Sequence, residues 1–169
     1  MRLRPAEDAD LPALADILNA EIRSGTASWT ETQRSSDAMR RWHAERRGAG
    51  HPVLVAEEGG RILGYASYGP FRRGEGYRLT VEHSVYVARD ARRRGVARAL
   101  MTVLIAEARA AGLHRMIGGV SADQEASMAL HRALGFVEAG RLTEVGRKRG
   151  RWLDLALMEL DLGGGGPGR

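Results

Sequence analysis

One stretch decides the fold of this 169-residue chain: Val85-Tyr86-Val87-Ala88-Arg89-Asp90-Ala91-Arg92-Arg93-Arg94-Gly95-Val96-Ala97. It has the pattern of a strand end, an arginine-rich loop that closes on a glycine, and the first turn of a helix. Such a turn leaves backbone N–H groups free and carries a partial positive charge, so it favours anions. Gly95 permits a positive φ and a close backbone approach. The geometry suits a diphosphate, but an exposed loop of solvated arginines has the same composition, and the residues alone leave both interpretations open.

The sequence on both sides of this stretch alternates between the helix and strand periods. From Ala97 to Ala108 apolar residues recur at helical spacing, and Gly112 is typical of the position after a helix C-terminus. Comparable patterns predict helices at 11–22, 36–47 and 125–134 and strands at 53–56, 62–68, 79–87, 116–120, 136–145 and 152–160. The predicted order, βααβββαβαββ, is that of an α/β (α+β) fold, with a mixed central sheet of six or seven strands and about four flanking helices. In helix 125–134 the residues expected to face the core are Ala126, Ala129, Leu130, Ala133 and Leu134.

Length and composition indicate one globular domain. We expect it to span residues 1–162 and to be followed by a disordered, glycine-rich tail at 163–169. A hydrophobic content of 43% argues against wholesale disorder. The absence of cysteine excludes a disulfide scaffold, a cysteine nucleophile and thiolate metal sites. The histidines share no ligand spacing, so we expect no metal site.

The basic charge does not indicate a nucleic-acid partner. The chain carries 26 Lys and Arg residues against 21 Asp and Glu residues, a net charge of +5. A nucleic-acid surface needs clustered charge, often with aromatic residues between the cations, whereas here the arginines are spread along the chain and aromatics make up 5%. No apolar stretch approaches the roughly 20 residues of a membrane helix, and the N-terminus lacks the apolar core of a signal peptide. We therefore expect a soluble cytoplasmic protein with neither nucleic-acid nor membrane partners.

Two short segments resemble the GNAT superfamily of N-acetyltransferases. The pattern Arg92-x-x-Gly95-x-Ala97 matches the acetyl-CoA signature [QR]-x-x-G-x-[GA] of that superfamily. The segment 127–136 is similar to its A-x-x-L-Y-x-x-x-G-F block, with His131 in place of the tyrosine. Segments 80–87, 130–136 and 146–154 also resemble the phosphinothricin and methionine sulfoximine N-acetyltransferases, and the likeness extends over residues 2–160.

This resemblance implies the GNAT fold and a reaction. The reaction is transfer of acetyl from acetyl-CoA, as cosubstrate and without a metal, to the α-amine of a small amino acid analogue in a ternary complex. It also implies a homodimer in which residues 146–154 contribute to the partner's site. Two alternatives stay open, a protein N-terminal acetyltransferase on the same fold and a non-catalytic module that binds CoA or nucleic acid.

The resemblance assigns the acetyl-CoA contacts to one strand, the loop after it and the first turns of two helices. A backbone N–H near Val85 would stabilise the oxyanion. Gln124 stands where many relatives have an asparagine that contacts the pantetheine arm. The candidate cofactor residues are Val85, Tyr86, Val87, Arg92, Arg93, Arg94, Gly95, Val96, Ala97, Arg98, Gln124 and Ser127.

Two residues are candidates for proton transfer. An α-amine is mostly protonated at neutral pH, so acetyl transfer needs a base. Glu82 lies on the opposite strand face from Val81 and Val85, where partial burial would raise its pKa, although a surface glutamate paired with an arginine has the same sequence pattern. His131 occupies the position of the thiolate-protonating tyrosine, and it is a candidate general acid or alternative base. The sequence does not decide which of the two is the base.

An anionic amino acid calls for a cationic acceptor site. Arg72 and Arg73 are candidates for a carboxylate clamp, because a guanidinium matches a carboxylate bidentately, although they fit an exposed loop nearly as well. Trp29 and Thr30 are candidates for closing the acceptor pocket beside Glu82, and Trp29 fits a core position equally.

Overall fold

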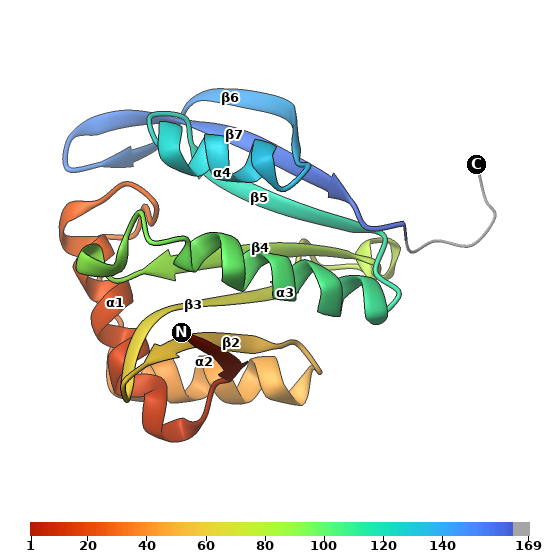
Figure 1. The fold of residues 1–169 in the computed structure, drawn as a ribbon. Helices are drawn as coiled ribbons and strands as arrows, with labels where there is room; N and C mark the ends of the chain where they lie inside the picture. The colour runs from red at the N-terminus through yellow and green to blue at the C-terminus, as the bar shows by residue number, and fades with distance from the viewer. Residues whose placement is uncertain (164–169) are drawn as a thin grey trace.

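A computed structural model describes residues 1–163 and shows a seven-stranded sheet with helices on both faces (Figure 1). The order across the sheet is β1-β2-β3-β4-β5-β7-β6, and all neighbouring pairs are antiparallel except β4–β5. The strands are β1 (Arg2–Pro5), β2 (Val53–Glu58), β3 (Arg61–Pro70), β4 (Thr80–Val87), β5 (Arg115–Ser121), β6 (Val137–Lys148) and β7 (Arg151–Asp161). The helices are α1 (Leu11–Ser24), α2 (Ser36–Gly48), α3 (Val96–Ala110) and α4 (Glu125–Ala133), with short 3-10 turns at Asp8–Asp10, Glu75–Tyr77 and Arg89–Ala91. The predicted fold class and element order are confirmed, while residues 164–169 of the predicted tail lie outside the described residues.

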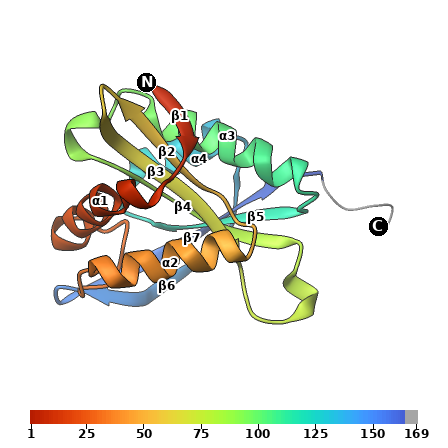
Figure 2. The same ribbon diagram turned by 90° about the horizontal axis from the view of Figure 1, so that it is seen from below.

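The sheet separates two hydrophobic cores. Helices α1 and α2 cover one face, and α3 and α4 cover the other (Figure 2). The continuous apolar run of β2 reflects burial on both sides: Leu54 and Ala56 pack under α3, whereas Val53 and Val55 pack under α1.

Most of the residues of α4 that were predicted to face the core do not face it. Its buried residues are Met128 and His131, and of the predicted set only Leu134, just after the helix, packs against the core. The others line a groove between α4 and α3, because that side of the helix faces an opening and not the sheet. They are Ala126, Ala129, Leu130 and Ala133.

The opening follows from the pairing of β4 and β5. These parallel strands pair only at Thr80–Glu82 with Arg115–Ile117. Farther along, β5 continues beside β7 and β4 continues beside β3, so within residues 1–163 the two strands no longer pair with each other. This separation places a strand edge of β4 next to the first turns of α3 and α4.

Candidate active site

The loop before α3 forms the anion-binding end of the site. Gly95 has φ 79° and directly precedes α3, and Arg93 has φ 61°, so two left-handed residues curve the loop. A Cβ at Gly95 would meet nothing within 4 Å, which means that φ and not space requires glycine there. The first turn of α3 has no side-chain cap, so its N–H groups remain available to an anion.

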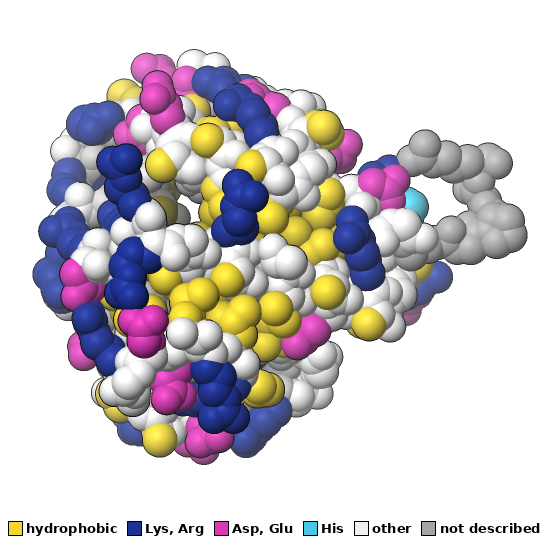
Figure 3. All heavy atoms as spheres, in the orientation of Figure 1, with side chains coloured by type: hydrophobic (Ala, Val, Ile, Leu, Met, Phe, Trp, Pro, Cys, Tyr) yellow, Lys and Arg dark blue, Asp and Glu magenta, His cyan; other side chains and the backbone are white. Residues whose placement is uncertain are grey.

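A groove of about 720 Å³ extends from this loop between α3, α4 and β4. Figure 3 shows apolar side chains gathered around it and basic side chains at the end where α3 begins. Its lining includes most of the predicted cofactor residues, namely Val85, Tyr86, Val87, Arg92, Arg93, Gly95, Val96, Ala97, Arg98, Gln124 and Ser127. A basic loop followed by an apolar wall and an open strand edge fits a diphosphate attached to an amide-bearing chain, as in CoA.

A second pocket, of about 370 Å³, continues from this groove. Val85, Tyr86, Gln124 and Ser127 border both spaces, so the groove and the pocket meet at β4. The second pocket contains the predicted residues Glu82, His131 and Trp29, and it also contains Arg46 and His83. We refer to it as the acceptor pocket.

Glu82 faces the acceptor pocket from β4, while its neighbour Val81 is buried under α3. The side chain is solvent-accessible within the pocket, and partial desolvation there raises the pKa of the Glu82 carboxyl. Among residues 1–163 no Lys, Arg or His nitrogen lies within ion-pair distance of it. The carboxyl therefore differs from the surface ion pair that the sequence left open, and it has the properties of a proton acceptor.

His131 is buried and hydrogen-bonded to a second histidine. Its Nδ1 lies 2.7 Å from the carbonyl oxygen of Ser127, which can only accept, so Nδ1 carries the proton. Its Nε2 lies 3.0 Å from Nε2 of His83 and therefore accepts the His83 proton. Burial and the neighbouring His131 lower the pKa of His83 to about 3, and burial lowers that of His131. Both rings are thus neutral at pH 7.

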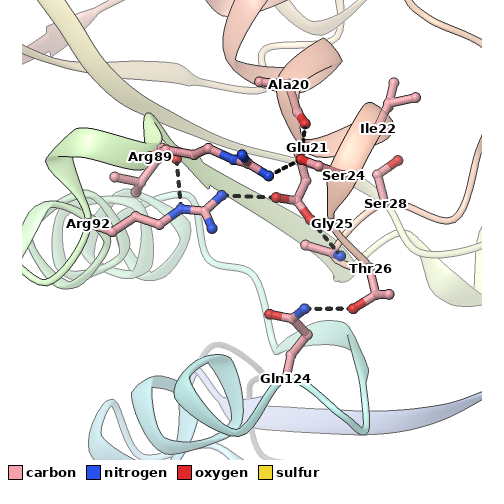
Figure 4. Close-up of polar contacts among 12 residues, drawn as sticks. Ala20, Glu21, Ile22, Ser24, Gly25, Thr26, Ser28, Arg89, Arg92 and Gln124 are labelled. Atoms are coloured by element: carbon pink, nitrogen blue, oxygen red, sulfur yellow. Dashed lines mark hydrogen bonds and ion pairs between the residues drawn. The ribbon is translucent and has the colours of Figure 1, made fainter.

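The segment 25–29 contributes Ala27, Ser28 and Trp29 to the lining of the acceptor pocket and is held from both sides (Figure 4). On the α3 side, the buried Glu21 accepts hydrogen bonds from Arg92 and from the backbone of Ala27, each at 2.9 Å. On the α4 side, Gln124 donates to Thr26 at 2.6 Å. The buried Lys148 of the β6–β7 hairpin also donates to the Gly25 carbonyl at 2.8 Å. We call residues 25–29 the strap.

Trp29 ends the strap and lines the acceptor pocket, as predicted. Its ring packs on the backbone of β6, where a Cβ at Gly146 would come within 2.1 Å of it. Thr30 does not line the pocket, because its hydroxyl turns back to accept from the Thr32 backbone at 3.3 Å.

Three predicted arginines lie outside the groove and the acceptor pocket. Arg94 points away from the groove and pairs with Glu58 at 2.5 Å. Arg72 and Arg73 line a separate hollow of about 550 Å³, since β3 extends to Pro70 and carries the following loop past the acceptor pocket. The guanidinium of Arg72 lies over the Phe71 ring at 5.1 Å from its centroid.

The structure adds three residues that the sequence interpretation missed. Arg46 and His83 line the acceptor pocket, and Gly118 of β5 lies against the histidine pair, where a Cβ would come within 2.6 Å of His83 Nε2. Two consecutive glycines inside a strand, Gly118 and Gly119, indicate that other side chains pack closely on that strand. Nothing in the sequence of α2 singled out Arg46 from the other arginines of that helix.

The described residues lack two features that are typical of other classes of protein. Within residues 1–163 no group of three or more His, Asp or Glu side chains is arranged to hold a metal ion. No helix in that range has the length and apolar character needed to span a membrane.

Comparisons with known proteins agree with this geometry. The acetyltransferase (GNAT) family model matches residues 14–136. The L-methionine sulfoximine/L-methionine sulfone acetyltransferase of Pseudomonas paraeruginosa is 46% identical over 161 residues, covering 95% of this chain and 94% of that protein. A ribosomal-protein-alanine N-acetyltransferase structure from Brucella melitensis has a TM-score of 0.94 and 48% identity, with 95% and 99% of the two chains covered. A Sinorhizobium meliloti phosphinothricin acetyltransferase in complex with AcCoA has a TM-score of 0.95 and 37% identity, with 99% and 91% covered.

The matched region begins in α1 and ends just past α4, so it contains the curved loop, the open edge of β4 and the residues of both spaces. Sequence, fold and site thus lead to one conclusion: the chain belongs to the acetyltransferase (GNAT) family, whose members use acetyl-CoA.

Proposed function

We propose that the protein transfers acetyl from acetyl-CoA to the α-amine of a small amino acid analogue, of the methionine sulfoximine, methionine sulfone or phosphinothricin type, in a ternary complex. The continuity of the groove and the acceptor pocket at Val85 and Tyr86 carries this proposal. It allows a thioester held along β4 to meet an amine held beside Glu82. The names of the Pseudomonas and Sinorhizobium relatives support the substrate class.

On the cofactor side, Arg92, Arg93 and the backbone of residues 95–98 would hold the diphosphate, while the backbone of Val85–Val87 would pair with the pantetheine amides. Acetyl-CoA supplies the activated acetyl group. A backbone N–H near Val85 would donate to the thioester oxygen. Gln124 and Ser127 border the passage between groove and pocket, where the end of the pantetheine arm would lie.

On the acceptor side, Glu82 would take one proton from the ammonium group of the substrate. The free amine would then form a bond to the thioester carbon, the C–S bond would break, and the CoA thiolate would leave as the thiol with the second proton of the amine. Its raised pKa brings it closer to the range in which a base works well near neutrality. His131 is less suited to this role, because its unprotonated Nε2 already accepts from His83. We assign His131 to shaping the pocket beside Glu82, with Trp29 covering the amino acid.

Replacement of Glu82 by glutamine tests the catalytic assignment. Because glutamine keeps the shape but cannot take a proton, kcat should fall about 100-fold or more, while acetyl-CoA affinity stays within about twofold. Thiol release with methionine sulfone and phosphinothricin measures turnover, and calorimetry measures cofactor binding. Glu125→Gln, an exposed glutamate on α4, is the matched control. Unchanged turnover in Glu82→Gln would remove this residue from the mechanism.

A second candidate acceptor is a protein N-terminus, since the Brucella neighbour carries the name of a ribosomal-protein-alanine N-acetyltransferase. A peptide acceptor has to leave the pocket through an open end, whereas the strap lines one side of the pocket and is tied to α4 by the Gln124–Thr26 hydrogen bond. Peptides with N-terminal alanine belong in the same thiol-release screen. Faster turnover of the peptides than of the amino acid analogues would favour this second function.

We also propose a cytoplasmic homodimer. The β6–β7 pair exposes large apolar side chains, of which Val137, Val145 and Trp152 are each more than half exposed. Light scattering should give twice the monomer mass, and Trp152→Arg should reduce it. A monomeric wild-type protein at micromolar concentration would contradict the dimer.

A further inference from the structure

Arg46 is a cation without a partner in the acceptor pocket. It comes from the last turns of α2, and its Nε is buried without a hydrogen-bond partner. None of its nitrogens forms an ion pair or a side-chain hydrogen bond within residues 1–163. Glu45 attracts the guanidinium without coming within ion-pair distance, so burial still lowers the pKa of Arg46. Partial burial of a charge that lacks a direct partner is costly, so the site is suited to an anionic ligand.

The surroundings of Arg46 hold the guanidinium in this position. Its central carbon lies 5.9 Å from the centroid of the Trp42 ring. On the other side is the backbone of β3, where a Cβ at Gly69 would come within 1.9 Å of Nη1. Glycine at position 69 therefore makes room for the guanidinium beside Pro70 and Glu82.

The charges that line the acceptor pocket are complementary to an amino acid zwitterion. Arg46 supplies the cation and Glu82 the carboxyl group, and the lining contains no other Lys, Arg, Asp or Glu. The two histidines of the pocket are neutral because they are buried and hydrogen-bonded to each other. An α-amino acid carries one ammonium and one carboxylate on the same carbon, which matches one carboxyl and one guanidinium group.

We propose that Arg46 binds the α-carboxylate of the acceptor and thereby selects amino acids over simple amines. This inference rests on the proposed function and adds the group that recognises its substrate. A guanidinium presents two parallel N–H donors to a carboxylate, which fixes the orientation of the α-carbon as well as its charge. The ammonium group on that carbon is then directed to Glu82.

The alternative clamp, Arg72 and Arg73, is separated from this pocket. Both line the hollow beyond Pro70, together with His51 and Tyr77, and neither lines the acceptor pocket. The two arginine sites can therefore be distinguished by mutating one at a time.

The experiment compares two acceptors with the same uncharged side chain. Methionine sulfone carries the α-carboxylate, whereas 3-(methylsulfonyl)propylamine lacks it. In Arg46→Met we expect kcat/KM for methionine sulfone to fall about 100-fold, mainly through KM, and kcat/KM for the amine to stay within about threefold. Arg47→Met, an exposed neighbour on α2, and Arg72→Met should leave both values within about threefold. Calorimetric titration of methionine sulfone into the CoA-saturated protein should show binding to wild type and none to Arg46→Met.

Every other outcome contradicts either the role of Arg46 or the proposed function on which it rests. Equal losses for both acceptors in Arg46→Met would give Arg46 a purely structural role, and a selective loss in Arg72→Met would move the carboxylate site to the loop. Equal calorimetric affinity of wild type and Arg46→Met would also overturn the assignment. If wild type acetylates neither acceptor, the proposed function fails and not the role of Arg46 alone. Arg46→Lys guards against misfolding, since it keeps the charge and should retain part of the selectivity.

Discussion

At the scale of single residues, the histidine pair shows how hydrogen bonding fixes a protonation state. His131 donates to the Ser127 carbonyl and accepts from His83, so His131 cannot gain a proton at Nε2 without losing the hydrogen bond to His83. Nδ1 of His83 is buried without a partner, and burial also disfavours its protonation. The pair is therefore a neutral wall of the acceptor pocket, and the charge of that pocket is set by other residues.

This pair predicts a loss of stability in acid. Burial holds the pKa of His83 at about 3, whereas the imidazole of the unfolded chain protonates near pH 6.5. As the pH falls below 6.5 the unfolded state gains a proton that the folded state does not, so the free energy of unfolding decreases. This single group should lower the free energy of unfolding by about 2 kcal/mol between pH 7 and pH 5. Urea unfolding at both pH values should show a smaller decrease for His83→Gln than for wild type.

The same comparison can contradict the assignment. Groups that do not contact His83 contribute equally to both proteins, so their effects cancel in the difference, and the glutamine amide can still donate to His131 in place of His83. An identical decrease in wild type and His83→Gln would mean that His83 already titrates normally in the folded protein.

At the scale of elements, β5 is shaped to make room for the side chains of β4 and α4. A Cβ at Gly118 would lie 2.6 Å from His83 Nε2 and 3.0 Å from His131 Nε2, so the two buried, hydrogen-bonded rings would have to shift together. At Gly119 a Cβ would lie 3.3 Å from a Glu82 carboxyl oxygen, which is the end of a flexible side chain.

Alanine at these two glycines should therefore have different effects. Gly118→Ala should destabilise the protein by about 1–3 kcal/mol through overpacking, and it should lower turnover by displacing the histidines. Gly119→Ala serves as the matched control and should change stability by less than about 1 kcal/mol. Thermal unfolding and thiol release measure the two effects. Equal stability of the two variants would show that the histidine pair can move aside.

The junction between the arginine loop and α3 predicts a second pair of effects. Gly95→Asp places a negative charge at the anion-binding turn, so acetyl-CoA affinity should fall at least about 100-fold. Gly60→Asp in the β2–β3 turn is a suitable control, because Gly60 has φ 78° against 79° at Gly95 and both have open space around a Cβ. The control should lose similar stability and keep its affinity, as measured by calorimetry. Equal affinities in both variants would exclude this turn from the cofactor site.

At the scale of the whole molecule, local patterns were sufficient to predict the order of elements. Gly112 follows α3 with φ 71°, and the turn at Gly59 and Gly60 joins β2 to β3, as their neighbours in sequence indicated. The face of α4 was not predictable in the same way. Helical periodicity finds an apolar stripe, but it cannot distinguish a stripe that packs on a core from one that lines a cofactor groove.

The site was predictable where its residues lie in segments that resemble a known motif. The segment from Glu82 to Arg98 contributes to both spaces, and its motif made that visible. The acceptor pocket also draws on Arg46 from α2, which tertiary packing brings to β4 and which no local pattern indicated. The loop of Arg72 was misplaced because the length of β3, and not any local signal, determines where that loop points.

The short pairing between β4 and β5 has a consequence for the hydrogen exchange of backbone amides. Successive N–H groups of a strand point to opposite sides, so along residues 83–87 those directed at β3 are bonded and those directed at the groove face solvent. Deuterium should therefore enter alternate amides of this segment quickly and the amides between them slowly. When a ligand with amides of its own lies along this edge, the fast positions should become slow and the alternation should disappear. The exchange rates of individual amides at the open edge of β4 would then show whether the groove holds a ligand.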